Sequence, residues 1–165
     1  MNNAMDSIRI VTAELDRVEH QQAFLTLMDL YARDPMQGGI ALPDNVRNEL
    51  IPELRKHPAS MLWLAYRGSE AVGFTVCLLG FSTFAARPLI NIHDISVRAD
   101  CRGLGVGKLL MNTIEAEARE LRCCKITLEV REDNEVARGL YRKLGFDRSN
   151  VGAQKIPMEF WQKKL

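Results

Sequence analysis

Hydrophobic and polar positions along this 165-residue chain follow two different periods in turn. Apolar residues that recur at spacings of three and four are typical of helices, and short apolar runs bounded by turn-forming residues are typical of strands. The pattern predicts about four helices, over residues 14–31, 43–56, 104–121 and 134–144. It predicts about seven strands, over residues 8–11, 61–66, 71–79, 90–97, 125–130, 146–151 and 157–162.

The order of these elements predicts an α/β fold with a mixed, mostly antiparallel sheet. The turn Arg67–Glu70 is expected to close a hairpin, and residues 80–88 are expected to form a connection. A turn containing Gly152 is expected to join the last two strands. The second helix contains Pro52, which can divide a helix into two pieces because proline lacks a backbone N–H.

Composition and charge exclude several classes of protein. A chain of this length with 47% hydrophobic residues is expected to fold as a single domain over residues 1–165. The formal net charge is +1, so no strong field favours nucleic acid or an anionic membrane. The longest apolar stretch, Ala71–Phe81, is too short to span a bilayer, and Met1–Ser7 lacks the pattern of a signal peptide. We therefore expect a cytoplasmic protein that binds neither nucleic acid nor membrane.

The cysteines do not suggest a disulfide or a metal site. No two of them have C-x-x-C spacing, and an adjacent pair is a poor disulfide or zinc candidate. All four are therefore expected to be free thiols: Cys77, Cys101, Cys123 and Cys124.

A glycine-rich segment, Arg102–Lys108, lies between a predicted strand and a predicted helix. Glycines let the backbone approach a bulky anion, and the first N–H groups of a helix have no intrahelical acceptor, so the segment predicts a diphosphate site. It is not a Walker loop, because Arg102 and Leu109 stand where that motif needs Gly and Ser or Thr. It also lacks the dinucleotide fingerprint, because Gly107 falls one residue early.

The R-x-x-G-x-G pattern of this loop, together with a block further along, resembles the GCN5-related N-acetyltransferases (GNAT superfamily). Residues 134–146 match the N-x-x-A-x-x-L-Y-x-x-x-G-F block of that family after one intervening strand. The resemblance covers about residues 90–146, the expected acyl-CoA-binding core. It implies a GNAT-like fold with a V-shaped splay between the fourth and fifth strands, acetyl-CoA as co-substrate and no metal.

The resemblance also implies which residues bind the cofactor. The strand before the loop supplies backbone groups for the thioester carbonyl and pantetheine, the loop binds the diphosphate, and the second motif contacts the pantetheine arm. Carried over to this chain, these are Ile95, Ser96, Val97, Arg102, Gly103, Leu104, Gly105, Val106, Gly107, Lys108, Asn134, Ala137 and Tyr141. Asn134 is also a candidate helix N-cap, which is compatible with that role.

Acetyl transfer to an amine needs a base, an oxyanion site and an acid for the departing thiolate. Tyr141 matches the position of the family's general acid. The alternative is that Tyr141 is a core aromatic of an amphipathic helix. A covalent cysteine route is disfavoured, because no cysteine lies in a recognisable arrangement with a base.

Two residues are candidates for the general base, Glu129 and His93, and Asp94 beside His93 is an alternative. Glu129 precedes Tyr141 by twelve residues, as in the similar ribosomal-protein alanine acetyltransferases, and alternation turns it away from Leu128. It can equally be a surface glutamate. His93 matches the position of a proposed glutamate base in spermidine/spermine-type acetyltransferases, and histidine ordinarily titrates near ~6.5. Neighbouring Asp94 should face the opposite side from His93 unless a bulge intervenes.

The sequence therefore predicts an acetyl-CoA-dependent N-acetyltransferase acting by direct transfer in a ternary complex. The acceptor is expected to be a small amine or amino-acid-like molecule. The resemblance implies that it is bound by the first two helices, by their loop at Asp34–Asn45 and by the last strands. Alternatives are a peptide or protein acceptor, at an N-terminus or a lysine, a longer acyl group, and a non-catalytic acyl-CoA sensor. A homodimer is possible, since dimers are frequent in the family.

Overall fold

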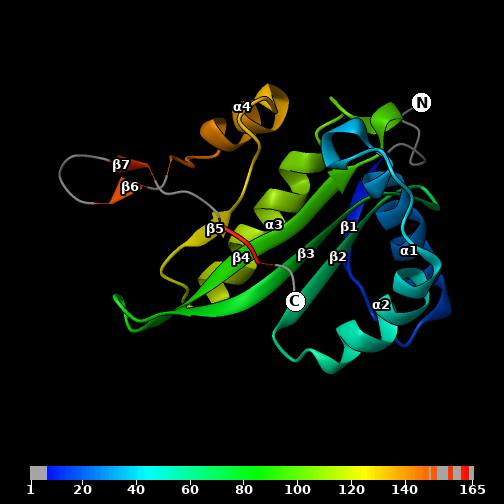
Figure 1. Ribbon diagram of the computed structural model, residues 1–165, viewed down its shortest axis with the longest axis horizontal. Coiled ribbons are helices and arrows are strands. Elements are labelled where there is room, and N and C mark those ends of the chain that lie inside the picture. Colours follow the sequence, from blue (N-terminus) through cyan, green and yellow to red (C-terminus); the bar gives the residue numbers. More distant parts are fainter. Residues whose placement is uncertain (1–6, 149, 152–155, 158–160, 164–165) are drawn as a thin grey trace. The chain divides into compact units, whose positions relative to one another are not determined.

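The computed structural model describes residues 7–148, 150–151, 156–157 and 161–163. By internal contacts the chain divides into two compact units, Met1–Glu129 and Val130–Leu165, and each is described here by itself. Figure 1 shows the elements of both.

The first unit is built on a five-stranded sheet in the order β1-β2-β3-β4-β5. The first four strands are antiparallel, and β5 runs parallel to β4, which confirms the predicted mixed, mostly antiparallel sheet. Their bounds are Ile8–Thr12 for β1, Ser60–Arg67 for β2, Glu70–Ser82 for β3, Arg87–Val97 for β4 and Ile126–Leu128 for β5.

The prediction of about seven strands in the sheet was wrong, because the sheet of the described chain has five. β6 (Asn150–Val151) and β7 (Ile156–Pro157) belong to the second unit and, among the described residues, pair with each other and with no further strand. Pro157 has no N–H to donate to a further ladder, and two-residue strands extend a sheet poorly. The predicted turn at Gly152 and residues 158–160 lie outside the described residues.

Four α-helices are present, as predicted: α1 (Val18–Ala32), α2 (Asp44–Lys56), α3 (Val106–Glu120) and α4 (Glu135–Lys143). α1 starts later than predicted because a turn precedes it, in which the Arg17 N–H donates to Glu14 O and the Glu14 N–H donates to His20 Nδ1. Pro52 lies inside an undivided α2. It faces solvent, where water can satisfy the carbonyl that its missing N–H leaves free.

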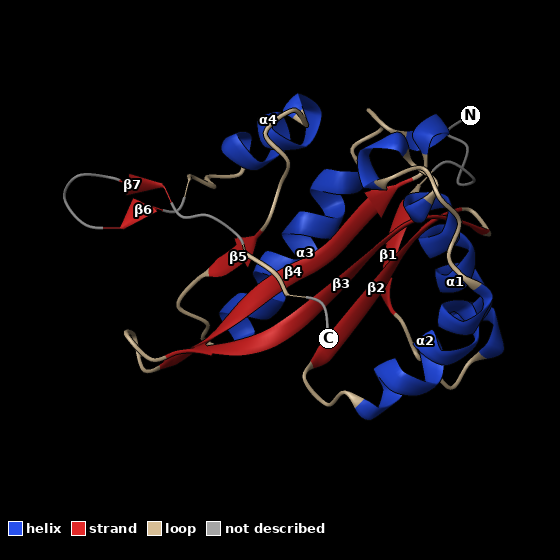
Figure 2. Cartoon of the chain, in the orientation of Figure 1, coloured by secondary structure: helices blue, strands red, loops and turns tan. Residues whose placement is uncertain are grey.

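Helices cover both faces of the five-stranded sheet, with α1 and α2 on one face and α3 on the other (Figure 2). The ring of Phe24 on α1 packs edge-on against Phe74 of β3, with 5.4 Å between centroids. Burial of apolar side chains is the main stabilising term of such a layer. The core on this face consists of Phe24, Leu27, Ile51, Leu62, Leu64, Phe74 and Val76.

On the opposite face, Gly73 allows β3, β4 and α3 to lie close together. A Cβ at this position would lie 2.9 Å from the backbone oxygen of Ser96 and 3.3 Å from Val106 Cγ1. Any side chain would therefore push β4 or α3 away. Both neighbours belong to segments that the sequence predicts to bind acyl-CoA.

The β3–β4 hairpin is longer than predicted, because most of the expected connection 80–88 is strand. Residues 79–82 of β3 pair with residues 87–90 of β4, beyond the end of β2. Gly80 and Pro88 suggest a loop by residue type, but Phe81 lies opposite Pro88 near the tip of the hairpin, where a strand tolerates proline.

Candidate functional site

β4 loses its neighbour β5 partway along its length. The two strands pair only from Ile90↔Ile126 to Ile92↔Leu128, and residues 93–97 continue against β3 alone. The Arg98 N–H donates to Val72 O over 2.9 Å, on the β3 side. Since successive N–H groups of a strand point in opposite directions, those of Ile95 and Val97 point to the open side. The V-shaped splay of the fourth and fifth strands stays a prediction, because β5 itself ends at Leu128, where the pairing ends.

The three candidate residues of β4 are therefore not equivalent. Ile95 and Val97 present backbone groups at an edge with no partner strand among the described residues, which suits binding of amide groups from an extended ligand. Ser96 lies opposite Phe74, so its backbone groups are directed to β3.

The glycine loop after β4 leaves free N–H groups at the start of α3. Gly103 and Gly105 have φ angles of 81° and 84°, and Gly105 is the N-cap of α3 without a side-chain cap. The first N–H bonded into the helix is that of Leu109, which donates to Gly105 O over 3.0 Å. Within the described chain, the N–H groups of residues 106–108 have no acceptor. Free N–H groups at the start of a helix, together with the helix dipole, are suited to binding an anion.

Space around this loop is also suited to a bulky anion. A Cβ at Gly103 or Gly105 would meet nothing within 4 Å, so glycine is needed there for the positive φ and the surface is open. Val106 is buried and fixes the helix start to the sheet, whereas Leu104 and Lys108 are exposed. Lys108 is thus a cation near the free N–H groups.

Arg102 has a partner that the sequence did not indicate. Its Nη2 donates to Asp34 Oδ2 over 2.6 Å, and its Nε donates to Val97 O over 3.1 Å. The hydrogen bond from Arg102 lowers the pKa of Asp34. The carboxylate of Asp34 is therefore already neutralised and is a poor attractant for a cationic acceptor.

A β-bulge in β4 brings His93 and Asp94 to one region. Val76 lies opposite Asp94 and Cys77 opposite Ile92, so His93 is the extra residue. This is the bulge that permits both side chains to border the same site. Burial raises the pKa of Asp94, and the nearby charge of His93 opposes that rise. His93 itself is exposed.

Asp94, Asn91 and Thr127 lie on the same face of the sheet, and alternation assigns Glu129, the first residue after β5, to that face. Asn91 Nδ2 donates to Thr127 Oγ1 over 3.2 Å, which joins β4 to β5 on one face. Asn91 lies opposite Leu78, two residues after Val76, so this is the face that α1 and α2 cover elsewhere. By alternation, Glu129 follows Thr127 on that face, and its side chain is exposed. Two candidate bases thus share the side expected for the acceptor.

The remaining candidates, Asn134, Ala137 and Tyr141, lie in the second unit. Asn134 is the N-cap of α4, and its Oδ1 accepts the Ala137 N–H over 3.1 Å, which confirms the expected cap. Tyr141 is 8% exposed and packs against Phe146 with 5.9 Å between ring centroids. Burial raises the pKa of Tyr141, so its hydroxyl remains a proton donor at neutral pH.

Two of the four cysteines are buried, which disfavours them as nucleophiles. All four are free, as predicted, and Cys77 and Cys101 are buried. Burial raises the pKa of Cys77 to about 11, which keeps this thiol protonated at neutral pH.

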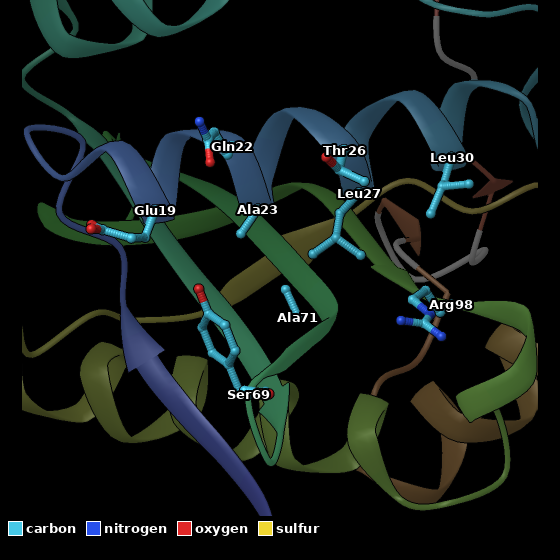
Figure 3. A pocket seen from close by; sticks show the side chains of 10 residues that line it. Glu19, Gln22, Ala23, Thr26, Leu27, Leu30, Ser69, Ala71 and Arg98 are labelled. Atoms are coloured by element: carbon cyan, nitrogen blue, oxygen red, sulfur yellow. The ribbon is translucent and has the colours of Figure 1, made fainter.

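A separate open pocket of about 360 Å³ lies between α1 and the β2–β3 hairpin (Figure 3). It contains none of the predicted site residues. Arg98, its only basic side chain, is held by Asp100 at 2.6 Å and Glu70 at 3.3 Å. The lining residues are Glu19, Gln22, Ala23, Thr26, Leu27, Leu30, Tyr66, Ser69, Ala71 and Arg98. No helix of the described residues is long and apolar enough to cross a membrane.

Solved structures of similar fold include several acetyltransferases. A probable acetyltransferase is 24% identical with a TM-score of 0.74, over 93% of this chain and 99% of the other. The ribosomal-protein-alanine N-acetyltransferase of Brucella melitensis biovar Abortus 2308 is 18% identical with a TM-score of 0.70, over 96% and 100%. AAC(6')-Iy, in complex with the bisubstrate analogue CoA-S-monomethyl-acetylneamine, is 17% identical with a TM-score of 0.72, over 96% and 99%. At these identities the matches establish the fold.

The family model described as the acetyltransferase (GNAT) family matches residues 24–146. This range includes the open edge of β4, the glycine loop and α4, which carries Tyr141. Members of this family are acetyltransferases that use acetyl-CoA. The chain belongs to the acetyltransferase (GNAT) family.

Proposed function

We propose that this protein transfers the acetyl group of acetyl-CoA to a primary amine, by direct attack in a ternary complex. The observation that carries the proposal is the group of free N–H groups at the start of α3, in the segment that follows the open edge of β4. A diphosphate can be bound by the free N–H groups of a helix start, and an amide-containing arm by an open strand edge.

The residues suit acetyl-CoA by their chemistry. Free N–H groups of residues 106–108 would hold the diphosphate, with Lys108 nearby. The backbone groups of Ile95 and the N–H group of Val97 would bind the pantetheine amides, since Val97 O already accepts from Arg102 Nε. Bound there, acetyl-CoA supplies a thioester carbonyl open to attack by an amine. Asn134 and Ala137 are assigned to the pantetheine arm from the family motif.

Proton transfer is assigned to side chains of the two units. An alkyl ammonium group of pKa ~10.4 must lose a proton before it attacks. Glu129 and His93 are the proposed bases, and Asp94 is the rival. The burial that raises its pKa makes the Asp94 carboxylate a stronger base than an ordinary aspartate. Tyr141 is proposed as the acid that protonates the departing thiolate, which requires the neutral hydroxyl that burial favours.

The acceptor is proposed to be a small amine or amino-acid-like molecule. The polar side chains Asn91, Asp94, Thr127 and Glu129 share the face of β4 and β5 assigned to the acceptor. Two carboxylates there favour a cationic, hydrogen-bonding molecule. A ribosomal-protein-alanine acetyltransferase has the same fold, so a peptide terminus is the second candidate.

Release of CoA thiol from acetyl-CoA tests the proposal, measured over a panel of polyamines, amino acids, aminoglycosides and peptides. We expect acceptor-dependent release with at least one small amine. Release with peptides alone would select the second candidate. Tight acetyl-CoA binding without release for any acceptor would contradict the enzymatic function and favour an acyl-CoA sensor.

A further inference from the structure

Asp34 and Arg102 join the two loops that serve different substrates under the proposed function. Asp34 begins the loop between α1 and α2, which is assigned to the acceptor, and Arg102 begins the glycine loop assigned to the diphosphate. Arg102 Nη2 lies 2.6 Å from Asp34 Oδ2, while Arg102 Nε donates to Val97 O. One guanidinium therefore contacts the acceptor loop and the end of β4 at once.

Asp34 also fixes the conformation of the acceptor loop. Its Oδ1 accepts the N–H of Met36 over 2.9 Å. Its backbone oxygen accepts the N–H groups of Gln37 over 2.8 Å and Gly39 over 3.2 Å. The Asp34 side chain is 17% exposed, so these bonds are partly shielded from water. The order of residues 34–39 thus depends on Asp34.

Different carboxylates hold the two ends of this loop: that of Asp34 bonds to Met36 at the start, and that of Asp29 bonds to Leu42 at the end. At the start, the Asp34 N–H donates to Tyr31 O, and the ring of Tyr31 packs edge-on against Phe74 at 5.8 Å. At the far end, Asp29 Oδ1 accepts the N–H of Leu42 over 3.1 Å. Arg102 bonds only to the first of these carboxylates. A ligand bound at the glycine loop should therefore change the mobility of residues 36–39 and leave that of Leu42 unchanged.

We infer that Asp34 is a positioning residue that couples acetyl-CoA binding to the order of the acceptor loop through Arg102. The inference rests on the proposed function. A guanidinium carries five N–H donors, and two of those on Arg102 are used in the described structure. A diphosphate in the glycine loop can engage the others while the bond to Asp34 persists. A bound diphosphate then restricts the motion of Arg102, and through the bond to Asp34 it stabilises the hydrogen bonds that Asp34 accepts from residues 36–39.

Amide hydrogen exchange with and without CoA tests this coupling before an acceptor is known. Saturating CoA should slow exchange in the wild type at Met36, Gln37 and Gly39 by about two- to fivefold, the size expected of a partly exposed ion pair. Exchange at Leu42 should not change. Asp34→Asn keeps an oxygen for the Met36 N–H but removes the charge. CoA should bind this variant at least as tightly, because Arg102 is no longer neutralised, yet the slowing should disappear.

Glu53→Gln is the matched control, since it removes a carboxylate from another exposed ion pair, with Lys56 at 2.6 Å. It should behave as the wild type. Equal slowing in Asp34→Asn and the wild type, no slowing in a wild type that binds CoA, or loss of slowing in Glu53→Gln would each overturn the inference alone. A wild type that does not bind CoA would overturn the proposed function and the inference with it.

Steady-state kinetics extend the test once an acceptor is found. Asp34→Asn should raise the KM of the acceptor about two- to fivefold without raising the KM of acetyl-CoA. A rise in both KM values would mean that Asp34 only supports the fold, and the coupling would be rejected.

Discussion

The side of the protein that we assign to the cofactor and the side that we assign to the acceptor use different chemical groups. The first uses backbone groups, and the second uses side chains. Under the proposed function, acetyl-CoA is bound by backbone N–H groups at the β4 edge and at the start of α3. On the side that we assign to the acceptor, Asp94 and Glu129 would provide the charge, and Asp29 and Asp34 hold the loop between α1 and α2. A backbone site can serve one invariant ligand with many sequences, whereas a side-chain site changes its ligand with single substitutions.

The largest expected effect comes from removing one hydroxyl. Tyr141→Phe should lower kcat by about 100-fold or more, the usual range for loss of a general acid, while the Kd of acetyl-CoA stays within about twofold. Steady-state assays of thiol release measure kcat, and calorimetry measures the Kd of acetyl-CoA. Phe146→Leu is the control, because it alters the packing beside Tyr141 and keeps the hydroxyl. Full turnover in Tyr141→Phe would show that the residue is a core aromatic.

The pH profile of kcat/KM distinguishes the bases on the acceptor side. The base acts when deprotonated, so kcat/KM should fall as pH falls through its pKa, and removing it should cost about 100-fold at neutral pH. The variants are His93→Ala, Glu129→Gln and Asp94→Asn. An acidic limb that disappears in one of them and persists in the other two identifies the base. A limb unchanged in all three would exclude every candidate.

Substitutions at two glycines with positive φ allow a direct comparison of the cofactor side with the acceptor side. Gly105 (φ 84°) belongs to the cofactor loop and Gly39 (φ 73°) to the acceptor loop, and a Cβ at either meets nothing within 4 Å. Alanine at each should therefore introduce similar backbone strain of ~1–2 kcal/mol. Gly105→Ala should weaken acetyl-CoA binding about five- to tenfold, and Gly39→Ala should raise only the acceptor KM. The reverse result, or equal effects on both ligands, would contradict the division.

The smallest effect concerns the stability cost of Asp94. Because burial raises its pKa, the charged form destabilises the fold above that pKa, and the penalty disappears as pH falls toward the unfolded value of ~3.9. Asp94→Asn should raise Tm by about 2 °C at pH 7 and should have no such advantage near pH 3. Thermal unfolding at both pH values measures this. An advantage confined to acid pH would show that the carboxylate is stabilised when charged.

Local features were predictable from the sequence because they depend on residues close together in the chain. The glycine loop, the cap at Asn134 and the four helices each follow from spacing and residue type. The expected alternation at Glu129 stays a prediction, because β5 ends at Leu128.

Features set by distant pairing were not predictable in this way. The bulge at His93 depends on how β4 registers against Val76 and Cys77, and neither strand alone records that register. The bond between Arg102 and Asp34 joins positions 68 residues apart. The pairing of β6 with β7 alone, which reduced the expected sheet to five strands, is also a choice of partner that apolar patterns do not encode.

Titration with CoA, followed by backbone amide chemical shifts, tests most directly whether main-chain groups hold the cofactor. We predict that the largest shifts occur at residues 103–108 and at Ile95 and Val97. Small shifts at these amides, with the main changes at the pocket between α1 and the β2–β3 hairpin, would contradict the assignment.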